Sequence, residues 1–270
     1  MGHAPTAKLF RLDERTIAIT GGAGYLGVEA ARCILESGAD VVCLDVVETP
    51  RPAGSSKFEE VAKKYGQEIC YHRLDVTDSQ AISKTFETFV PSLRYPIRGM
   101  VACAGVSDND PAHEFSVDRF RRVVDINLNG TFAIARAVAL EMQRANVDGS
   151  MVFTASMSGS VSNKGVDTAA YNASKSGVLQ LGRSLAAEWG SRKGMPLIRV
   201  NTLSPGYIRT PATEEALRKP GMEEQWKGDN MLYRLSRVDE YRGPILFLLS
   251  DASSFMTGAD LRVDGGHCAW

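Results

Sequence analysis

The sequence is short of three things: paired cysteines, blocks of one charge and long apolar runs. Its five cysteines are scattered without CxxC or Cys/His ligand spacing, so neither a disulfide framework nor a metal site is expected. Lys and Arg number 31 against 32 Asp and Glu, with no basic block, which argues against nucleic acid or an acidic membrane as a partner. No apolar run resembles a signal peptide or approaches a membrane span. We therefore expect a cytoplasmic protein with a small-molecule ligand.

The composition that remains fits one large globular domain over residues 1–270. Hydrophobic residues make up 44% and charged residues 23% of the chain, which is enough for a sizeable core. Short apolar runs alternate with longer amphipathic stretches, and this predicts strands alternating with helices. Because the apolar runs are nearly continuous, they predict an α/β fold with a doubly wound parallel sheet that is covered on both faces.

The boundaries of these elements follow from the same pattern. The expected strands lie at 16–20, 41–46, 68–74, 99–104, 150–155, 197–203 and 259–264. The expected helices lie at 24–37, 56–65, 78–90, 116–145, 169–191 and 239–250. Asp78 and Ser116 are placed as N-caps, and Gly38 as the residue that closes the first helix. A surface loop is expected at 48–56, and an insertion near the carboxyl edge of the sheet at 205–230.

A glycine-rich turn follows the first predicted strand, where "TIAIT" runs into "GGAGYLG" and then into a helix. Gly21 allows a sharp turn, Gly24 lets backbone N–H groups approach a pyrophosphate, and Gly27 allows close helix–strand packing. The turn therefore predicts a dinucleotide site. An ordinary strand-to-helix loop is the alternative, because a glycine triplet alone does not decide between the two.

Two acidic residues at strand ends bear on the choice of cofactor. Asp45 ends the second apolar run about 20 residues after the glycines, where a carboxylate hydrogen-bonds an adenosine ribose. A carboxylate there also repels a 2′-phosphate, so we expect NAD to be preferred, with NADP possible. A solvated strand end is the alternative for Asp45. Asp75 would bond the adenine amino group or begin the next turn.

Tyr171 and Lys175 lie four residues apart in "YNASK" on a predicted helix, so their side chains share one face. A tyrosine loses its proton near pH 10 (about 10 in peptides), and a neighbouring ammonium should lower that pKa toward the range of a general base. Ser156 is the expected donor to the substrate oxygen, with Ser158 as its rival. A surface Tyr/Lys pair is the alternative, and the glycine turn argues against it.

Six motifs in order make the chain resemble the short-chain dehydrogenase/reductase superfamily over residues 15–266. They are "TGGAGYLG" at 20–27, "CAG" at 103–105, Asn127 in "DINLNG", "SMSG" at 156–159, "YNASK" and "SPGYIRT" at 204–210. The resemblance implies a Rossmann-like sheet of seven strands and hydride transfer between a nicotinamide cofactor and a secondary alcohol or ketone. It also implies a catalytic set of Asn127, Ser156, Tyr171 and Lys175, in which Asn127 positions a water linked to Lys175.

The resemblance further implies where the cofactor lies and how the chain assembles. The cofactor contacts expected from it are Gly21, Gly24, Tyr25, Leu26, Asp45, Val46, Asp75, Val76, Cys103, Ala104, Gly105, Tyr171, Lys175, Pro205, Gly206, Ile208 and Thr210. A homotetramer is favoured, with a homodimer as the smaller form. Within the superfamily, the chain most resembles fungal polyol dehydrogenases and ketose reductases of the arabinitol, mannitol and sorbose type. Carbonyl reductases of secondary metabolism share this resemblance.

Two departures from the superfamily pattern keep other functions open. Tyr25 stands where the single-domain branch has its middle glycine, and the resulting spacing TGxxGxxG is similar to that of nucleotide-sugar epimerases. Cys103 replaces an asparagine, which puts a sheet contact in doubt. An epimerase is the alternative enzyme, although the chain lacks the extra domain of that group. A dinucleotide-sensing protein without chemistry is the alternative from another class.

Substrate contacts are expected in two loops. The segment 161–168 should line the site between Ser156 and Tyr171, where Asn163 and Asp167 would bond substrate hydroxyls; a solvated polar loop is the alternative. A lid is expected around 205–236, with plain packing as the alternative. Its apolar residues are Met222, Trp226, Met231, Leu232 and Tyr233. The tail that ends at Trp270 is expected to contact a neighbouring subunit.

Overall fold

A computed structural model describes residues 5–50 and 52–270 and contains a seven-stranded parallel sheet in the order β3-β2-β1-β4-β5-β6-β7. The strands are β1 (Thr16–Thr20), β2 (Asp40–Asp45), β3 (Ile69–Arg73), β4 (Ile97–Ala102), β5 (Gly149–Thr154), β6 (Ile198–Pro205) and β7 (Asp260–Val263). All seven predicted strands are present, within two residues of their expected bounds. The predicted α/β class with a parallel sheet is therefore confirmed.

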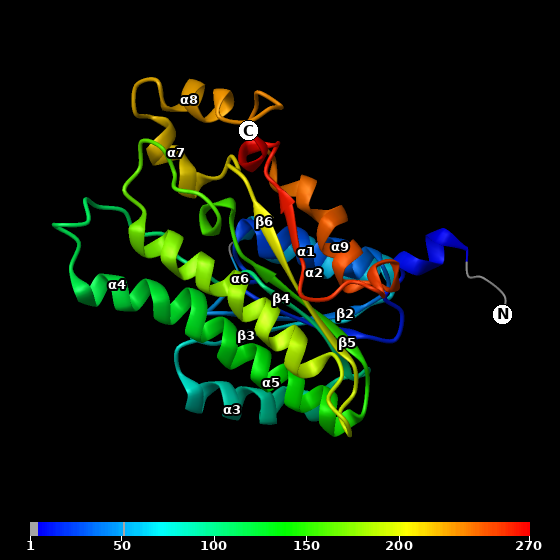
Figure 1. Cartoon of the computed structure of the whole chain (residues 1–270). Helices are drawn as coiled ribbons and strands as arrows, with labels where there is room; N and C mark the ends of the chain where they lie inside the picture. Colours follow the sequence, from blue (N-terminus) through cyan, green and yellow to red (C-terminus); the bar gives the residue numbers. More distant parts are fainter. Residues whose placement is uncertain (1–4, 51) are drawn as a thin grey trace.

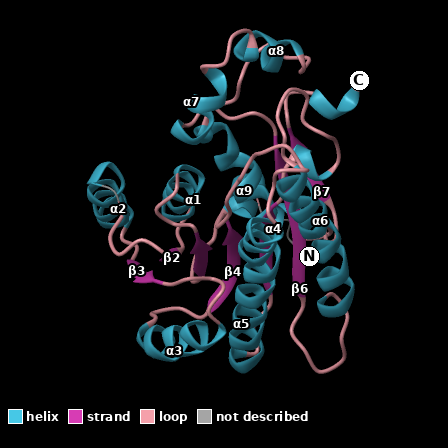
Figure 2. Ribbon diagram, turned by 90° about the vertical axis from the view of Figure 1, so that its left-hand side faces the viewer, coloured by secondary structure: helices cyan, strands magenta, loops and turns pink. Residues whose placement is uncertain are grey.

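Helices cover both faces of this sheet (Figure 1, Figure 2). One face carries α3 (Ser79–Phe89), α4 (Val117–Val124), α5 (Gly130–Ala145) and α6 (Ala169–Trp189). The other carries α1 (Tyr25–Glu36), α2 (Pro52–Tyr65) and α9 (Arg242–Leu249), the last preceded by a 3-10 turn at Val238–Tyr241. Two short helices, α7 (Pro211–Leu217) and α8 (Met222–Gly228), lie beyond the carboxyl edge of the sheet (Figure 2).

The core is split into two layers by the alternation of side chains along each strand. In β1, Ala18 contacts the layer of α3, α5 and α6, whereas Ile17 and Ile19 contact the layer of α1, α2 and α9. In β5, Phe153 and Val152 divide in the same way, and all five side chains are fully buried. Burial on both faces explains why the strands appear in the sequence as continuous apolar runs.

The predicted helix ends hold at three places and fail at one. Asp78 accepts hydrogen bonds from the N–H groups of Gln80 and Ala81, and Ser116 accepts one from Arg119, so both are N-caps. Gly38 has a φ of +97°, a left-handed conformation that favours glycine after a helix. The helix expected at 56–65 begins at Pro52, four residues inside the predicted loop 48–56. Proline suits a first helical position because its missing N–H has no partner there in any helix. Residue 51 of that loop, and residues 1–4 of the expected domain, lie outside the described residues.

The helix expected at 116–145 runs without interruption as α4, a π-helical turn at Asp125–Asn129, and α5. Its residues Val117–Ala145 are long and apolar enough, by length and composition, to cross a membrane, so the expectation that no stretch approaches such a span was wrong. The physical reason is packing. Ile134, Val138 and Met142 are fully buried against the sheet, and a helix in a protein core needs an apolar face for that contact.

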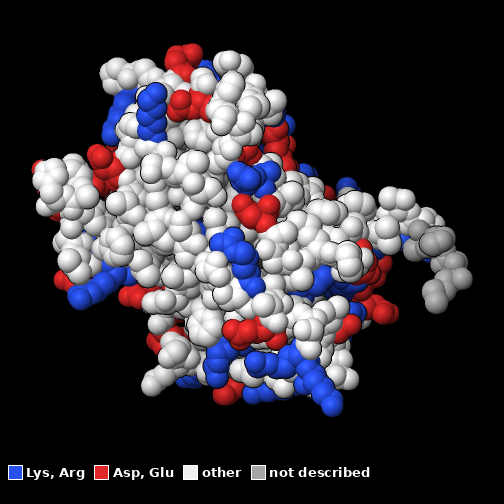
Figure 3. Space-filling model, in the orientation of Figure 1, with Lys and Arg blue, Asp and Glu red and all other residues white. Residues whose placement is uncertain are grey.

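The segment expected to form a lid contains α7 and α8 and divides into packed and exposed parts. Met222 and Trp226 are buried in a small cluster with Leu217 and Leu235. For these two residues, the structure therefore agrees with the alternative of plain packing. Met231, Leu232 and Tyr233 are exposed. Over the face drawn in Figure 3, basic and acidic side chains are interspersed, and neither sign dominates a large area.

Candidate active site and dinucleotide cleft

A cleft of about 530 Å³ lies at the carboxyl ends of β1, β2, β3 and β4. The chain runs from β1 to β2 and β3 on one side and then returns to β4 on the other side of β1, and ligands of open α/β sheets bind where the strand order reverses in this way. Nine residues that were expected to contact a dinucleotide line the cleft. They are Gly21, Gly24, Asp45, Val46, Asp75, Val76, Cys103, Ala104 and Gly105.

The glycine turn has the geometry of a phosphate cradle. Gly21 has a φ of +66°, and a Cβ on it would lie 2.7 Å from the backbone nitrogen of Ala104. A Cβ on Gly27 would collide with the carbonyl oxygen of Gly21. At the start of α1, Gly24 offers no capping side chain, and the positive end of the helix dipole faces the turn, where it favours an anion. The turn therefore fits a bound pyrophosphate.

The two strand-end carboxylates differ in how they are held. Asp45 accepts hydrogen bonds from the N–H of Ala23, at 2.9 Å, and of Val47, at 3.3 Å, which fixes its carboxylate at the rim of the cleft. Asp75 accepts bonds through one oxygen from both the N–H and the hydroxyl of Thr77, and so begins the next turn, the second of its two expected roles. Both carboxylates line the cleft, where a ribose or an adenine would reach them.

The remaining cofactor residues expected from the resemblance lie outside the lining of this cleft. Tyr25 is 40% exposed, and the side chain of Leu26 packs against the core behind the glycine turn. Further along the described chain, Pro205 ends β6, Gly206 lies against Asp264, Ile208 bridges to Ser236, and Thr210 is the N-cap of α7. These four residues lie in the segment that runs from the end of β6 to the start of α7.

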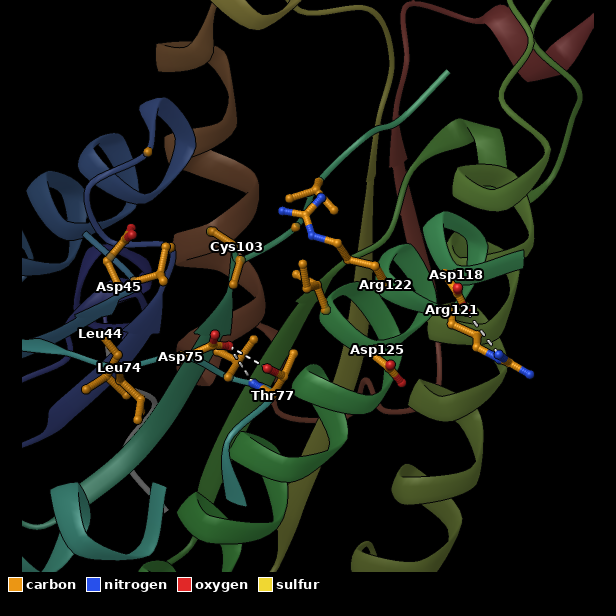
Figure 4. A pocket seen from close by; sticks show the side chains of 18 residues that line it. Leu44, Asp45, Leu74, Asp75, Thr77, Cys103, Asp118, Arg121, Arg122 and Asp125 are labelled. Atoms are coloured by element: carbon orange, nitrogen blue, oxygen red, sulfur yellow. Dashed lines mark hydrogen bonds and ion pairs between the residues drawn. The ribbon is translucent and has the colours of Figure 1, made fainter. Parts of the chain in front are cut away.

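Sequence reasoning missed the contribution of α4 to the cleft. Asp118, Arg121, Arg122 and Asp125 line it, and none of them is among the expected cofactor contacts. Figure 4 shows Arg122 reaching across the opening while Arg121 turns toward Asp118, to which it donates at 3.1 Å. Both arginines are exposed, so this wall of the cleft is open to solvent. The spacing 118, 121, 122 and 125 was the available signal, because residues three and four apart share a helix face.

Three of the four expected catalytic side chains meet at the end of β5 and the start of α6. The Ser156 hydroxyl is close enough to the phenol of Tyr171 to lower the pKa of that group. Lys175 lies with its ammonium 5.6 Å from the centre of the Tyr171 ring and donates to the carbonyl of Thr154 at 2.7 Å. Ser158, the rival for the serine role, uses its backbone N–H to bond the Ser156 hydroxyl and is itself buried. Ser156 is therefore the serine that faces the tyrosine.

Asn127 lies in the π-helical turn and contacts the same centre from the opposite side. Its amide oxygen accepts from the N–H of Val106 at 2.8 Å, and its amide nitrogen donates to the Ser174 hydroxyl at 2.9 Å. A Cβ on Gly105 would lie 3.2 Å from the Asn127 amide oxygen and 3.6 Å from Nζ of Lys175. Gly105 lines the cleft, so the dinucleotide site and the catalytic residues are contiguous.

Burial controls the protonation of the tyrosine–lysine pair. Removal from water raises the pKa of Tyr171, and the hydrogen bond from Ser156 partly opposes that change. Burial lowers the pKa of Lys175 to about 8. The expectation that the ammonium lowers the pKa of the phenol does not hold, because burial disfavours both charged forms. A protonated phenol is the form that donates a proton to a carbonyl oxygen.

The expected substrate residues of the 161–168 loop line a second cavity of about 210 Å³, beside the first turn of α6. Asn163 donates to the Tyr207 hydroxyl and accepts from the Thr168 hydroxyl, each at 3.3 Å. Asp167 is exposed, and its backbone carbonyl accepts from the N–H of Asp110. The same loop contacts the lid, where Gln225 donates to the carbonyl of residue 164.

Known proteins match nearly the whole chain. A family model described as "Enoyl-(Acyl carrier protein) reductase" matches residues 22–267. A protein of Aspergillus versicolor named "Short chain dehydrogenases/reductase notP'" is 64% identical, over 98% of this chain and 90% of that one. The chain belongs to the short-chain dehydrogenase/reductase family.

Members of this family with narrower names are less similar. An NADP-dependent mannitol dehydrogenase of Hypocrea jecorina is 35% identical and an NADH-dependent L-xylulose reductase of Ambrosiozyma monospora is 32% identical, each over 97% of both chains. Among solved structures, the NADPH-dependent 3-quinuclidinone reductase of Rhodotorula rubra superimposes with a TM-score of 0.88 at 30% identity, covering 100% of this chain and 98% of that one. The predicted single-domain branch of the family is thereby confirmed.

Proposed function

We propose that this protein is a nicotinamide-dependent oxidoreductase that transfers a hydride between its cofactor and a secondary alcohol or ketone, with a polyol or ketose as substrate. One observation carries the proposal: Lys175, which lies beside the Tyr171 ring, and Asn127 both lie next to Gly105, which lines a cleft that fits a dinucleotide. The mannitol dehydrogenase and L-xylulose reductase support the substrate class. A carbonyl of secondary metabolism is the other class that the resemblance implies.

The chain's own residues bind the reacting oxygen and move its proton. When bound, the cofactor supplies or accepts the hydride. Ser156 and Tyr171 hold the carbonyl oxygen by hydrogen bonds, which strengthen as negative charge grows on it. Tyr171 donates its proton to that oxygen during reduction and takes it back during oxidation. Lys175, with a pKa of about 8, can return a proton to the phenol near neutral pH. Asn127 would position the water that links Lys175 to solvent.

Neither alternative function gains support. The named relatives are dehydrogenases and reductases, whereas an epimerase was suggested only by the spacing of the glycine turn. A dinucleotide sensor has no need for a serine and a buried lysine beside one tyrosine. The oxidoreductase accounts for both the cleft and the buried polar group.

Replacing Tyr171 with phenylalanine tests the chemistry. We expect kcat for polyol oxidation and ketose reduction to fall by about 10²–10⁴-fold, because the proton donor is lost while the ring remains. NADH affinity, measured by fluorescence titration, should change less than about threefold, which shows that the cleft is intact. Turnover equal to that of the parent would falsify the proton transfer.

We propose NAD rather than NADP as the preferred cofactor, on the basis of Asp45. Its fixed carboxylate would accept a hydrogen bond from a ribose hydroxyl and would repel a 2′-phosphate. Asp45→Ala should lower kcat/KM for NAD by about 10–100-fold, the loss expected for a hydrogen bond to a charged group, and should raise it for NADP. Titration of the parent with both cofactors provides the control. A parent that binds NADP more tightly than NAD contradicts the assignment.

We further propose a cytoplasmic location and a homodimer or homotetramer. The absence of a disulfide framework supports the first, since the five cysteines are free thiols. Exposed apolar side chains on α4 and α5 support the second: Val117, Phe120 and Phe132 are 65%, 38% and 44% exposed. The partners that we propose are a small-molecule carbonyl or alcohol, the cofactor and further copies of the chain.

A further inference from the structure

Helix α4 brings two adjacent arginines to the wall of the dinucleotide cleft, and they differ in how their charge is used. Arg121 donates to the carboxylate of Asp118 at 3.1 Å, so its charge is already paired. Arg122 extends away from that pair, across the opening of the cleft (Figure 4). It forms neither a hydrogen bond nor an ion pair with any residue that the structure describes. Arg122 is therefore free to bind an anion that enters the cleft.

The other carboxylates near Arg122 are engaged by other groups. Asp125, one turn further along the helix, accepts a hydrogen bond from the side-chain amide of Asn129 at 2.7 Å. Asp108, in the loop after β4, is held through both of its oxygens by Arg119. A guanidinium binds an anion most strongly when two of its N–H groups reach two oxygens of that anion. The described part of the chain does not supply such an anion to Arg122.

The lining of the cleft is acidic, which is unfavourable for a ligand that carries phosphates. It contains two guanidinium groups against four carboxylates, those of Asp45, Asp75, Asp118 and Asp125. A dinucleotide brings the negative charges of its pyrophosphate close to these groups, and like charges repel more strongly where water is partly excluded. The glycine turn opposes this repulsion only with the partial positive charge of a helix end, about half a unit. A full positive charge on the wall formed by α4 would offset the remainder.

The position of Arg122 favours the pyrophosphate over a 2′-phosphate as its partner. A 2′-phosphate would lie on the adenosine ribose, which we expect beside Asp45. Figure 4 shows Asp45 and Arg122 on opposite sides of Cys103. The pyrophosphate joins the two halves of a dinucleotide, so it lies between the adenosine ribose and the nicotinamide. Arg122 is thus placed toward the middle of the ligand and away from the adenosine ribose.

We propose that Arg122 binds the pyrophosphate of the dinucleotide from the wall formed by α4, and that this contact supports the affinity for NAD and NADP alike. The proposal rests on the proposed function, because it needs a nicotinamide dinucleotide in the cleft. The planar guanidinium matches two phosphate oxygens, which a neutral side chain at this position would not. Arg122 binds the cofactor and takes no part in proton transfer.

The test measures the Kd of NADH and of NADPH by fluorescence titration in the parent and in Arg122→Met, which removes the charge and keeps an apolar stem. Both Kd values should rise about tenfold, the lower end of the range for hydrogen bonds to charged groups, because Arg122 is exposed to water. Arg136→Met is the matched control, at an exposed position of α5 outside the lining of the cleft, and should keep both values. Thermal unfolding reports whether each variant is folded.

Two further measurements separate a directed contact from a general effect of charge. Arg121→Met removes the same charge from the same wall, and it should raise the Kd of NADH by less than a third of the factor found for Arg122→Met, because Arg121 is directed at Asp118. Raising the KCl concentration should weaken NADH binding more in the parent than in Arg122→Met, since salt screens the contact that only the parent makes.

The possible outcomes separate this proposal from the proposed function. Equal losses for NADH and NADPH in Arg122→Met, with a smaller salt dependence, support the pyrophosphate contact. An unchanged NADH affinity, an equal loss in Arg121→Met or an unchanged salt dependence overturns it. A loss confined to one nucleotide also overturns it, and a loss confined to NADPH assigns Arg122 to the 2′-phosphate instead. A parent that binds NADH but neither oxidises alcohols nor reduces ketones overturns the proposed function alone, and a parent that binds neither nucleotide overturns both.

Discussion

At the scale of the residue, the burial of Lys175 links catalysis to stability. The side chain is 5% exposed, and its pKa falls from 10.5 to about 8. Below pH 8 the lysine is charged in the folded and the unfolded chain, so folding bears the full cost of burying the charge. Between pH 8 and 10.5 the unfolded chain binds more protons, and stability rises with pH. Above 10.5 the lysine is neutral in both states and the cost disappears.

Lys175→Met isolates this effect. The stability of the variant minus that of the parent should fall by roughly 3 kcal/mol between pH 7 and pH 10.5, the equivalent of the lowered pKa at about 1.4 kcal/mol per unit. Urea unfolding at a series of pH values measures it. Buried Cys33 and Cys43 have raised pKa values, which lowers stability above pH 9, but both proteins share them and the difference cancels. A gap that stays constant from pH 7 to 10.5 contradicts the prediction, and activity should be lost throughout.

At the scale of the element, the sequence predicted strands and helix caps correctly where the residues that form the pattern are also the residues that stabilise the element. Strands buried on both faces had to be continuously apolar, and the caps Asp78 and Ser116 form within their own helices. The start of α2 could not be predicted in this way, because Pro52 and Gly54 are typical of loops as well as of a first helical turn. The π-helical turn that places Asn127 also escaped prediction, since it leaves no mark in apolar periodicity.

The candidate site divides along the same line. Tyr171 and Lys175 share a helix face by spacing alone, so their proximity was predictable. The choice of Ser156 over Ser158 was favoured by the sequence but needed coordinates, because both precede the helix by similar lengths of loop. The role of Arg122 in the cleft depends on how α4 crosses the sheet. The second cavity depends on contact between two loops that lie about 50 residues apart.

At the scale of the whole molecule, the order of the strands gathers the functional residues. β1 lies between β2 and β4, so the carboxyl ends that bear Asp45, Cys103 and the glycine turn meet in one crevice. The catalytic residues follow β5 and enter α6, one strand further along the sheet. Helix α4–α5 closes the crevice on its other side and carries Asn127. The same helix leaves part of its surface uncovered.

That uncovered surface predicts how copies of the chain associate. Val117, Phe120, Val124, Leu128 and Phe132 recur every three or four residues along α4–α5 and form one apolar stripe. Leu128 contacts Gly177 of α6, whereas Phe132 is 44% exposed. An apolar stripe of this kind suits a two-fold interface in which each copy presents the same surface.

Phe132→Asp should therefore reduce the mass of the assembly in solution by half, from tetramer to dimer or from dimer to monomer, because a charge buried in an apolar interface loses its water without gaining a partner. Light scattering after size-exclusion chromatography measures the mass directly. Tyr65→Asp is the matched control, since that aromatic side chain on α2 is 40% exposed and lies away from the stripe, and its mass should equal that of the parent. A parent that is monomeric at micromolar concentration, or a Phe132→Asp protein with the mass of the parent, would show that this stripe is not the interface.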